Sequence, residues 1–103
     1  MRITSGTLKN KKIKSREGNE TRPTLERIKE AIFSIIGDKV VESKFLDLYS
    51  GTGNMAIEAL SRGAKRAILI EKNQEALRII IENINDCKLE NKSGYFCQWT
   101  QVT

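Results

Sequence analysis

The stretch Asp47-Leu48-Tyr49-Ser50-Gly51-Thr52-Gly53-Asn54 decides the fold. The short, mostly apolar run 45–49 is typical of a buried strand, and residues 54–62 carry apolar side chains at helical spacing. Glycine permits the tight turn between them and lets a ligand approach the backbone. Free N–H groups at the start of the helix then bind polar ligand atoms. The stretch therefore predicts a strand-to-helix loop that binds a nucleoside-containing ligand.

The segments after this loop repeat the pattern of strand and helix. Gly63 closes the helix, and residues 67–70 form a continuous apolar run, as expected for a parallel strand covered on both faces. Asn73 is a good N-cap for a third helix. The apolar face of that helix comprises Ala76, Leu77, Ile80, Ile84 and Cys87. With a third strand over 95–99, the chain reads as α/β, the first half of a doubly wound parallel sheet.

A basic hairpin and a helix are predicted ahead of the first strand. Apolar residues alternate loosely around a Ser5-Gly6 turn signal in 1–14, and residues 15–22 read as a loop. Pro23 suits the first turn of a helix, which Gly37 ends. Its expected apolar face is Leu25, Ile28, Ile32, Ile35 and Ile36. We therefore expect a basic hairpin and loop over 1–22 and a partial Rossmann-like domain over 23–103.

The net charge of +5 is unevenly placed. Residues 1–20 carry six basic and two acidic side chains, whereas the remaining 83 residues carry 12 basic and 11 acidic ones. Such asymmetry is typical of a protein that binds nucleic acid or another anionic surface. A solvated terminus that only aids solubility is the alternative. The candidate RNA contacts in this segment are Arg2, Lys9, Lys11, Lys12 and Lys14.

Composition argues against several other classes of protein. No apolar run approaches the roughly 20 residues that span a bilayer, and the N-terminus lacks the apolar core of a secretion signal. Cys87 and Cys97 have neither CxxC spacing nor a histidine partner, since the chain has no histidine. We therefore expect a cytoplasmic protein with reduced thiols, no membrane contact and no metal site.

Two acidic residues narrow the ligand of the glycine loop. Glu71 ends the second strand 18 residues after Gly53, near the spacing at which an acid receives two ribose hydroxyls. Asp47 would repel a pyrophosphate and attract a cation, which suits S-adenosylmethionine with its sulfonium and amino group. Two alternatives stay open. Residues 51–56 also fit the dinucleotide fingerprint G-x-G-x-x-A, and Asp47 could cap local backbone N–H groups.

At this point the sequence resembles a known family. Residues 47–53 are similar to motif I of class I S-adenosylmethionine-dependent methyltransferases. Three further stretches resemble the RsmD type of bacterial small-subunit rRNA guanine-N2 methyltransferases. These are Met1-Arg2-Ile3 with Ser5-Gly6, then Thr21-Arg22-Pro23-Thr24 with 27–33, and 58–64 running into Glu71-Lys72. The resemblance covers residues 1 to about 90, and Thr21–Thr24 is its most specific part.

The resemblance implies roles for particular residues. Gly51 and Gly53 would line the methionine end of S-adenosylmethionine, Asp47 would contact its amino group, and Glu71 would bind the ribose. The cofactor would also lie near Tyr49, Ser50, Thr52, Asn54 and Lys72. Arg22 and Thr24 would border the active site, while the basic hairpin contacts rRNA, either free or in a ribonucleoprotein. Alternatively, Arg22 and Thr24 cap the first helix, and Glu71 caps the third.

One departure from the family limits what we expect of this chain. The family carries an Asp/Asn-Pro-Pro-Tyr/Phe motif that holds the target amine, but the only proline here is Pro23. From Ser93 onward the sequence also ceases to resemble the family. We therefore expect a truncated enzyme that is inactive alone and that either self-associates through its exposed sheet edge or is only marginally stable. A non-catalytic binding module and a fragment of an NAD-type oxidoreductase are the alternatives.

Overall fold

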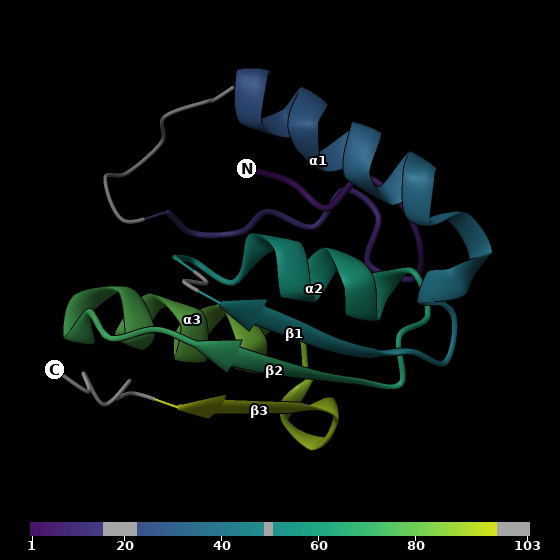
Figure 1. The fold of residues 1–103 in the computed structure, drawn as a ribbon. Coiled ribbons are helices and arrows are strands. Elements are labelled where there is room, and N and C mark those ends of the chain that lie inside the picture. Colours follow the sequence, from purple (N-terminus) through teal and green to yellow (C-terminus); the bar gives the residue numbers. More distant parts are fainter. Residues whose placement is uncertain (16–22, 49–50, 97–103) are drawn as a thin grey trace, which may run out of the picture.

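The computed structural model describes residues 1–15, 23–48 and 51–96 (Figure 1). Strands β1 (Lys44–Leu48), β2 (Arg66–Ile70) and β3 (Ser93–Phe96) form one parallel sheet in that order. Between them lie helix α2 (Asn54–Ser61) and helix α3 (Gln74–Asp86). Helix α1 (Pro23–Ile36) comes first, and the short 3-10 helices η1 (Gly37–Val40) and η2 (Glu90–Lys92) precede β1 and β3. The expected α/β fold with parallel strands is confirmed.

The register of the sheet brings two loops together. Leu48 pairs with Ile70, the last residues of β1 and β2. Because the strands are parallel and end side by side, the glycine loop after β1 and Glu71 after β2 emerge at the same edge. Ligands of open parallel sheets bind at this edge. The fold therefore places the two motifs that the sequence singled out next to each other.

All three helices pack on one face of the sheet. The rings of Phe33 in α1 and Phe45 in β1 are stacked, with their centroids 6.1 Å apart. Leu69 of β2 is fully buried in the same core as Ile57 of α2 and Ile80 of α3. Alternate residues of β1 and β2 point to this face, since side chains in a strand alternate with a period of two. The hydrophobic core lies between this face and the helices.

The opposite face of the sheet is uncovered in the part of the chain that the structure describes. Leu46 and Leu48 in β1 are 58% and 50% exposed, and Ile68 in β2 is 37% exposed. The expectation that residues 45–49 are buried and 67–70 covered on both faces is therefore wrong. The physical reason is that α1, α2 and α3 share a single face, so every second side chain meets solvent.

Helix α1 has the expected bounds but buries a different face. Ile28, Ile32 and Ile35 are exposed, and Lys29 and Phe33 are almost fully buried instead. Phe33 is fixed by its ring contact with Phe45, and Lys29 reaches a buried carboxylate of α2. These two contacts determine the rotation of the helix, so the apolar stripe turns outward. The side chain of Leu25 lies outside the described residues.

Residues 1–15, here called the N-terminal arm, pair with themselves and enter the core. Arg2 and Lys12 form a single antiparallel bridge, and Ile13 N–H donates to the Met1 carbonyl at 2.7 Å. The turn between the two halves spans residues 5–10 rather than Ser5-Gly6 alone. Ile3 and Ile13 are buried in the same core as Leu69. The arm is therefore packed against the sheet domain, and the expected boundary after residue 22 falls outside the described residues.

The remaining elements agree closely with the sequence. Asn73 caps α3 by accepting a hydrogen bond from the Ala76 N–H at 2.9 Å, and the whole predicted apolar face of α3 is buried. Strand β3 begins at Ser93, two residues before the expected start, and residues 97–99 lie outside the described part. Burial raises the pKa of the Cys87 thiol. Among the described residues, no helix is long and apolar enough to cross a bilayer.

The single covered face predicts unequal costs for two leucines on neighbouring strands. We expect Leu69→Ala to lower the free energy of unfolding by about 2–5 kcal/mol, since it opens a cavity in the core. Leu46→Ala should cost less than about 1 kcal/mol because that side chain is already 58% exposed. Urea unfolding at low protein concentration measures both. Equal losses would mean that both faces of the sheet are covered.

Candidate functional site

The candidate site is built from the backbone of the glycine loop and the carboxylate of Glu71. The Gly51 N–H donates to Glu71 Oε1 at 2.8 Å, and the Asn73 N–H donates to Glu71 Oε2 at 3.0 Å. Glu71 thus joins the loop after β1 to the start of α3. Each carboxylate oxygen can accept a second hydrogen bond. The carboxylate can therefore hold its two backbone donors and still accept ligand hydroxyls.

The two glycines of the loop, Gly51 and Gly53, lie in different surroundings. Gly51 has φ +63° and is exposed, and a Cβ built there meets no atom within 4 Å. Gly53 has φ +84° and is buried, and a Cβ there would lie 3.1 Å from Leu69 Cδ2. Both backbone conformations favour glycine. Gly53 lets the loop pack on the core, whereas Gly51 leaves its outer side open to a ligand.

The other predicted cofactor residues lie around this loop in different environments. Asp47 is half-buried on the covered face of β1, opposite Leu69 in the register. Asn54 is buried, and its side-chain oxygen accepts from Lys29 Nζ at 3.3 Å, so this amide faces the interior. Lys72 is exposed beside Glu71. Tyr49 and Ser50 lie outside the described residues.

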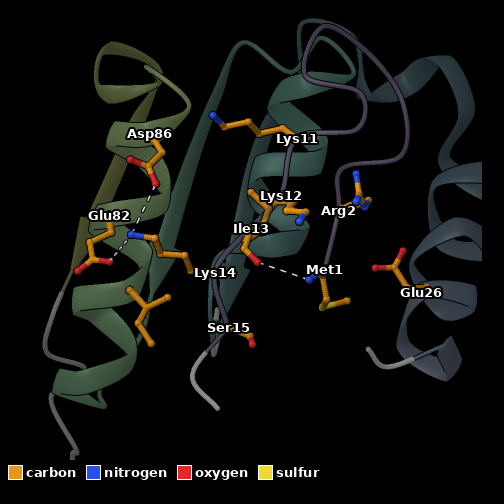
Figure 2. Close-up of a pocket in the computed structure, with 11 residues that line it drawn as sticks. Met1, Arg2, Lys11, Lys12, Ile13, Lys14, Ser15, Glu26, Glu82 and Asp86 are labelled. Carbon is orange, nitrogen blue, oxygen red and sulfur yellow. Dashed lines mark hydrogen bonds and ion pairs between the residues drawn. The ribbon is translucent and has the colours of Figure 1, made fainter. Parts of the chain in front are cut away.

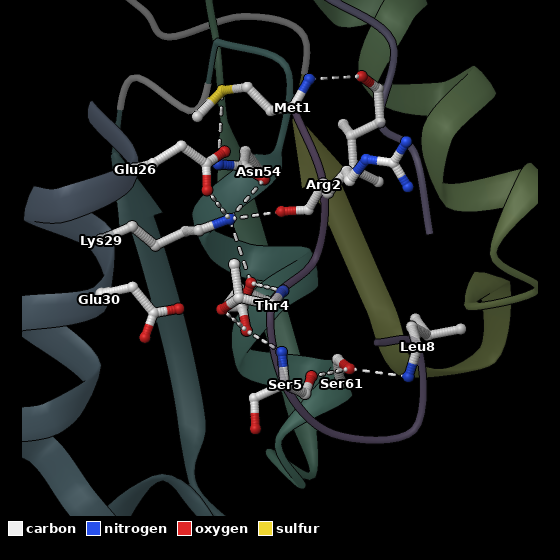
Figure 3. A network of polar contacts seen from close by, with 12 residues as sticks. Met1, Arg2, Thr4, Ser5, Leu8, Glu26, Lys29, Glu30, Asn54 and Ser61 are labelled. Carbon is white, nitrogen blue, oxygen red and sulfur yellow. Dashed lines mark hydrogen bonds and ion pairs between the residues drawn. The ribbon is translucent and has the colours of Figure 1, made fainter. Parts of the chain in front are cut away.

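Sequence reasoning missed a buried ionic network behind the loop (Figure 3). Lys29 and Glu58 are 1% and 0% exposed, and their charged groups are 3.1 Å apart. Lys29 Nζ also donates to the Arg2 carbonyl at 2.8 Å. Glu58 accepts from Arg62 Nε at 2.8 Å and from the backbone N–H groups of Thr4 and Ser5. The network therefore joins the arm, α1 and α2.

The charge of Glu58 is stabilised by these partners. Burial alone would raise the pKa of this carboxyl. The hydrogen bonds from Arg62 and Thr4 and the positive charge of Lys29 outweigh burial and hold the pKa of Glu58 below its ordinary value of 4.5. The carboxylate is therefore ionised at neutral pH, as a buried ion pair requires.

A second missed residue, Asn83 of α3, contacts the loop from inside. Its amide nitrogen donates to the Thr52 carbonyl at 2.9 Å and to the Lys14 carbonyl at 3.1 Å. The signals for Asn83 and Glu58 were present in the sequence. Each is a polar residue within the apolar pattern of a helix, and such residues are buried only with partners.

Four of the five basic residues of the arm line a groove of about 820 Å³ between α1 and α3 (Figure 2). Lys14 forms ion pairs there with Glu82 at 3.1 Å and Asp86 at 3.9 Å. The hydrogen bond to Glu82, together with the two negative charges, raises the pKa of Lys14. Lys9 is exposed in the turn of the arm. Arg2, Lys11 and Lys12 also line this groove.

Two predicted residues at the border of the site are not placed by their side chains. Arg22 lies outside the described residues, and only the backbone of Thr24 is described, in the first turn of α1. Glu26, two residues further along, lines the groove and lies 3.8 Å from Lys29 Nζ. The start of α1 thus lies beside both the groove and the ionic network.

Known proteins that are similar to this chain include two named as rRNA methyltransferases. The family model described as "Conserved hypothetical protein 95" matches residues 1–101. "Putative rRNA methyltransferase YlbH" of Bacillus subtilis is 37% identical over 89 residues, which are 86% of this chain and 48% of the relative. "Ribosomal RNA small subunit methyltransferase D" of Escherichia coli is 32% identical over 91 residues, 88% of this chain and 46% of the relative. The chain spans about half the length of these curated relatives.

A solved structure resembles the whole described fold. The "Putative methyltransferase yhhF from Escherichia coli" superposes with a TM-score of 0.83 at 26% identity, over 95% of this chain and 52% of the other. The resemblance to the RsmD type is confirmed. The family match runs to residue 101, so the expectation that the resemblance ends before Ser93 is wrong.

The ionic network predicts a specific dependence of stability on pH. Glu58→Gln should lower the free energy of unfolding by about 3–5 kcal/mol at pH 7, because buried Lys29 would lose its nearer carboxylate and keep only Glu26, at 3.8 Å, as a charged partner in the described part of the chain. Because the folded-state pKa of Glu58 is depressed, its contribution is complete above pH 4.5 and is lost as the pH falls through the folded-state pKa. Urea unfolding of the wild-type chain and of Glu58→Gln between pH 3 and 7 measures the difference in their free energies of unfolding. This difference should narrow only in acid. Glu42→Gln, at an exposed site, is the control, and a difference that stays constant down to pH 3 would contradict the prediction.

Proposed function

We propose that this chain, which belongs to the conserved hypothetical protein 95 family, carries the S-adenosylmethionine-binding part of a methyltransferase that acts on small-subunit rRNA. Two curated relatives are named as rRNA methyltransferases, which supports the activity and the class of substrate. We further propose that the three strands form one half of a doubly wound, Rossmann-like sheet. The high structural similarity to a methyltransferase-named protein supports that completion.

The observation that carries the proposal is the position of the Asp47 carboxylate. It is half-buried on the covered face of β1, just ahead of the glycine loop. A dinucleotide would place its pyrophosphate on the N–H groups at the start of α2, and a nearby carboxylate would repel it. A ligand with a sulfonium, an amino group and no phosphate suits this site. Asp47 therefore favours S-adenosylmethionine over NAD, whereas Glu71 can receive the ribose hydroxyls of either ligand.

The residues present fit that cofactor. Gly51 leaves open space beside the loop backbone, where the methionine end would lie, and Glu71 would accept its ribose hydroxyls. Asp47 would attract the amino group directly or through water, and Tyr49, Ser50, Thr52, Asn54 and Lys72 would complete the surroundings. The cofactor supplies a methyl group that its sulfonium activates for in-line displacement. The task of the protein residues is to bind and orient it.

The substrate that we propose is the exocyclic N2 amine of a guanine in small-subunit rRNA. Exposed basic side chains of the arm would contact phosphates of the RNA or its ribonucleoprotein. An rRNA substrate would also mean that the protein acts in the cytoplasm. Lys14 is held by Glu82 and Asp86, so Arg2, Lys9, Lys11 and Lys12 are the stronger candidates. Arg22 and Thr24 would border the reacting amine.

We propose that the 103 residues bind the cofactor without transferring its methyl group. The family's Asp/Asn-Pro-Pro-Tyr/Phe motif holds the target amine, and the only proline here is Pro23. This observation favours a second candidate, a non-catalytic module that binds cofactor and RNA. Methyl transfer to small-subunit rRNA by the chain alone would establish catalysis and exclude that candidate.

Cofactor choice gives the direct test of the proposal. Calorimetry should show binding of S-adenosylmethionine and none of NADH. Gly51→Ala should weaken S-adenosylmethionine binding at least tenfold, about 1.4 kcal/mol, since its methyl group enters the open side of the loop. Gly37→Ala is the matched control, because Gly37 has φ +58° and equally open surroundings away from the loop. NADH binding, or equal effects of the two variants, would contradict the proposal.

We also propose that the chain self-associates through its uncovered sheet face and the edge of β1. Exposed leucines favour such pairing when they lie beside a strand edge that no other described strand covers. Leu46→Lys should shift the sedimentation profile toward monomer, whereas Val41→Lys, at a similarly exposed position in the turn after η1, should not. A wild-type chain that sediments as a monomer at all concentrations would rule out self-association.

A further inference from the structure

Asn83 is a buried side chain with every bonding group of its amide engaged. It is 1% exposed. Its oxygen accepts from the Lys14 N–H at 2.9 Å, and its nitrogen donates to the Lys14 carbonyl at 3.1 Å and the Thr52 carbonyl at 2.9 Å. An asparagine amide has two N–H donors, so both are used. Such a fully bonded buried amide fixes the position of everything that it touches.

The three bonds connect two regions that the proposed function keeps distinct. Lys14 belongs to the basic arm, and Thr52 lies between the two glycines of the cofactor loop. The pair of bonds to Lys14 resembles the pairing of two peptide groups in a sheet. Because Asn83 itself lies on α3, its amide is a rigid link between the arm and the loop.

Two further contacts restrain the ends of this link, one at Lys14 and one at Gly51. The Lys14 ammonium also pairs with Glu82 of α3, so this end of the arm is held to the helix by backbone and side chain. The loop is held on its opposite side by Glu71 at Gly51. Thr52 directly follows Gly51, so the bond from Asn83 to the Thr52 carbonyl and the bond from Gly51 to Glu71 hold neighbouring peptide groups. A shift of one of these peptide groups therefore moves the other.

Asparagine is the residue type that this position requires. Aspartate offers the acceptor for the Lys14 N–H but loses both donors. Leucine matches the shape and loses all three bonds, which leaves buried backbone groups without these partners. Position 83 therefore requires asparagine because its three hydrogen bonds hold the arm and the loop in place, in addition to its packing in the core.

We propose that Asn83 is a positioning residue that couples the basic arm to the cofactor loop. A cofactor bound at the loop fixes the Thr52 peptide, which fixes the Asn83 amide and with it the backbone of Lys14. RNA bound to the arm acts in the reverse direction, because coupling between two binding sites is reciprocal. The cofactor part of this inference rests on the proposed function, whereas the link between arm and loop does not.

Amide hydrogen exchange of the full chain, read residue by residue by NMR, tests the link without ligand. Asn83→Leu should speed exchange of the Lys14 amide at least tenfold and shift the Gly53 amide resonance, which follows the Thr52 carbonyl. Asn85→Leu is the matched control, since Asn85 is exposed on the same helix. Asn83→Asp keeps one bond and serves if the leucine variant does not fold. Unchanged Lys14 and Gly53 signals in the Asn83 variant, or a uniform loss of protection, would overturn the inference.

The same amides with saturating S-adenosylmethionine test the coupling. The cofactor should slow exchange at Lys14 severalfold in the wild-type chain and in Asn85→Leu, but not in Asn83→Leu or Asn83→Asp. Binding that leaves Lys14 unchanged in the wild-type chain would overturn the coupling alone. If the wild-type chain fails to bind S-adenosylmethionine, the proposed function fails, and the exchange without ligand still decides the link.

Discussion

The structure depends on one buried carboxylate, Glu58 of α2. It is fully enclosed and receives Lys29 from α1, Arg62 from the C-cap of α2, and backbone N–H groups of the arm. Desolvating a carboxylate is costly, and only a complete set of partners offsets that cost. This requirement fixes the arm, α1 and α2 relative to one another. Arg62 also lies 4.7 Å above the Phe33 ring, which ties the network to the aromatic stack on β1.

The same constraint reaches the candidate site. Lys29 bonds to Asn54, the first residue of α2, and so holds the end of the glycine loop from beneath. Asn83 holds the middle of the loop through Thr52, and Glu71 holds its beginning through Gly51. The loop is thus attached at Gly51, Thr52 and Asn54, while its outer side stays open at Gly51. A backbone fixed in this way is preorganised, so binding a ligand costs little ordering of the loop.

Local signals were sufficient for most of the fold. The bounds of α1 and the Asn73 cap depend on residues close in sequence, and the structure has both as predicted. The meeting of Gly51 and Glu71 also followed, because parallel strands bring their carboxyl ends to one edge. The exposed face of α1 could not be predicted in this way, since a helix with isoleucines at 28, 32 and 35 would normally bury them. Lys29 reverses that pattern through a partner 29 residues away, which periodicity alone does not reveal.

A crystal structure of the chain grown with S-adenosylhomocysteine would test the cofactor site most directly. The predicted result places the ribose hydroxyls on the Glu71 carboxylate and the amino-acid end along Gly51, with the arm still bonded to Asn83. A ligand in the groove between α1 and α3, or one that leaves Glu71 and the glycine loop without contact, would contradict the central claim that this loop is the cofactor site.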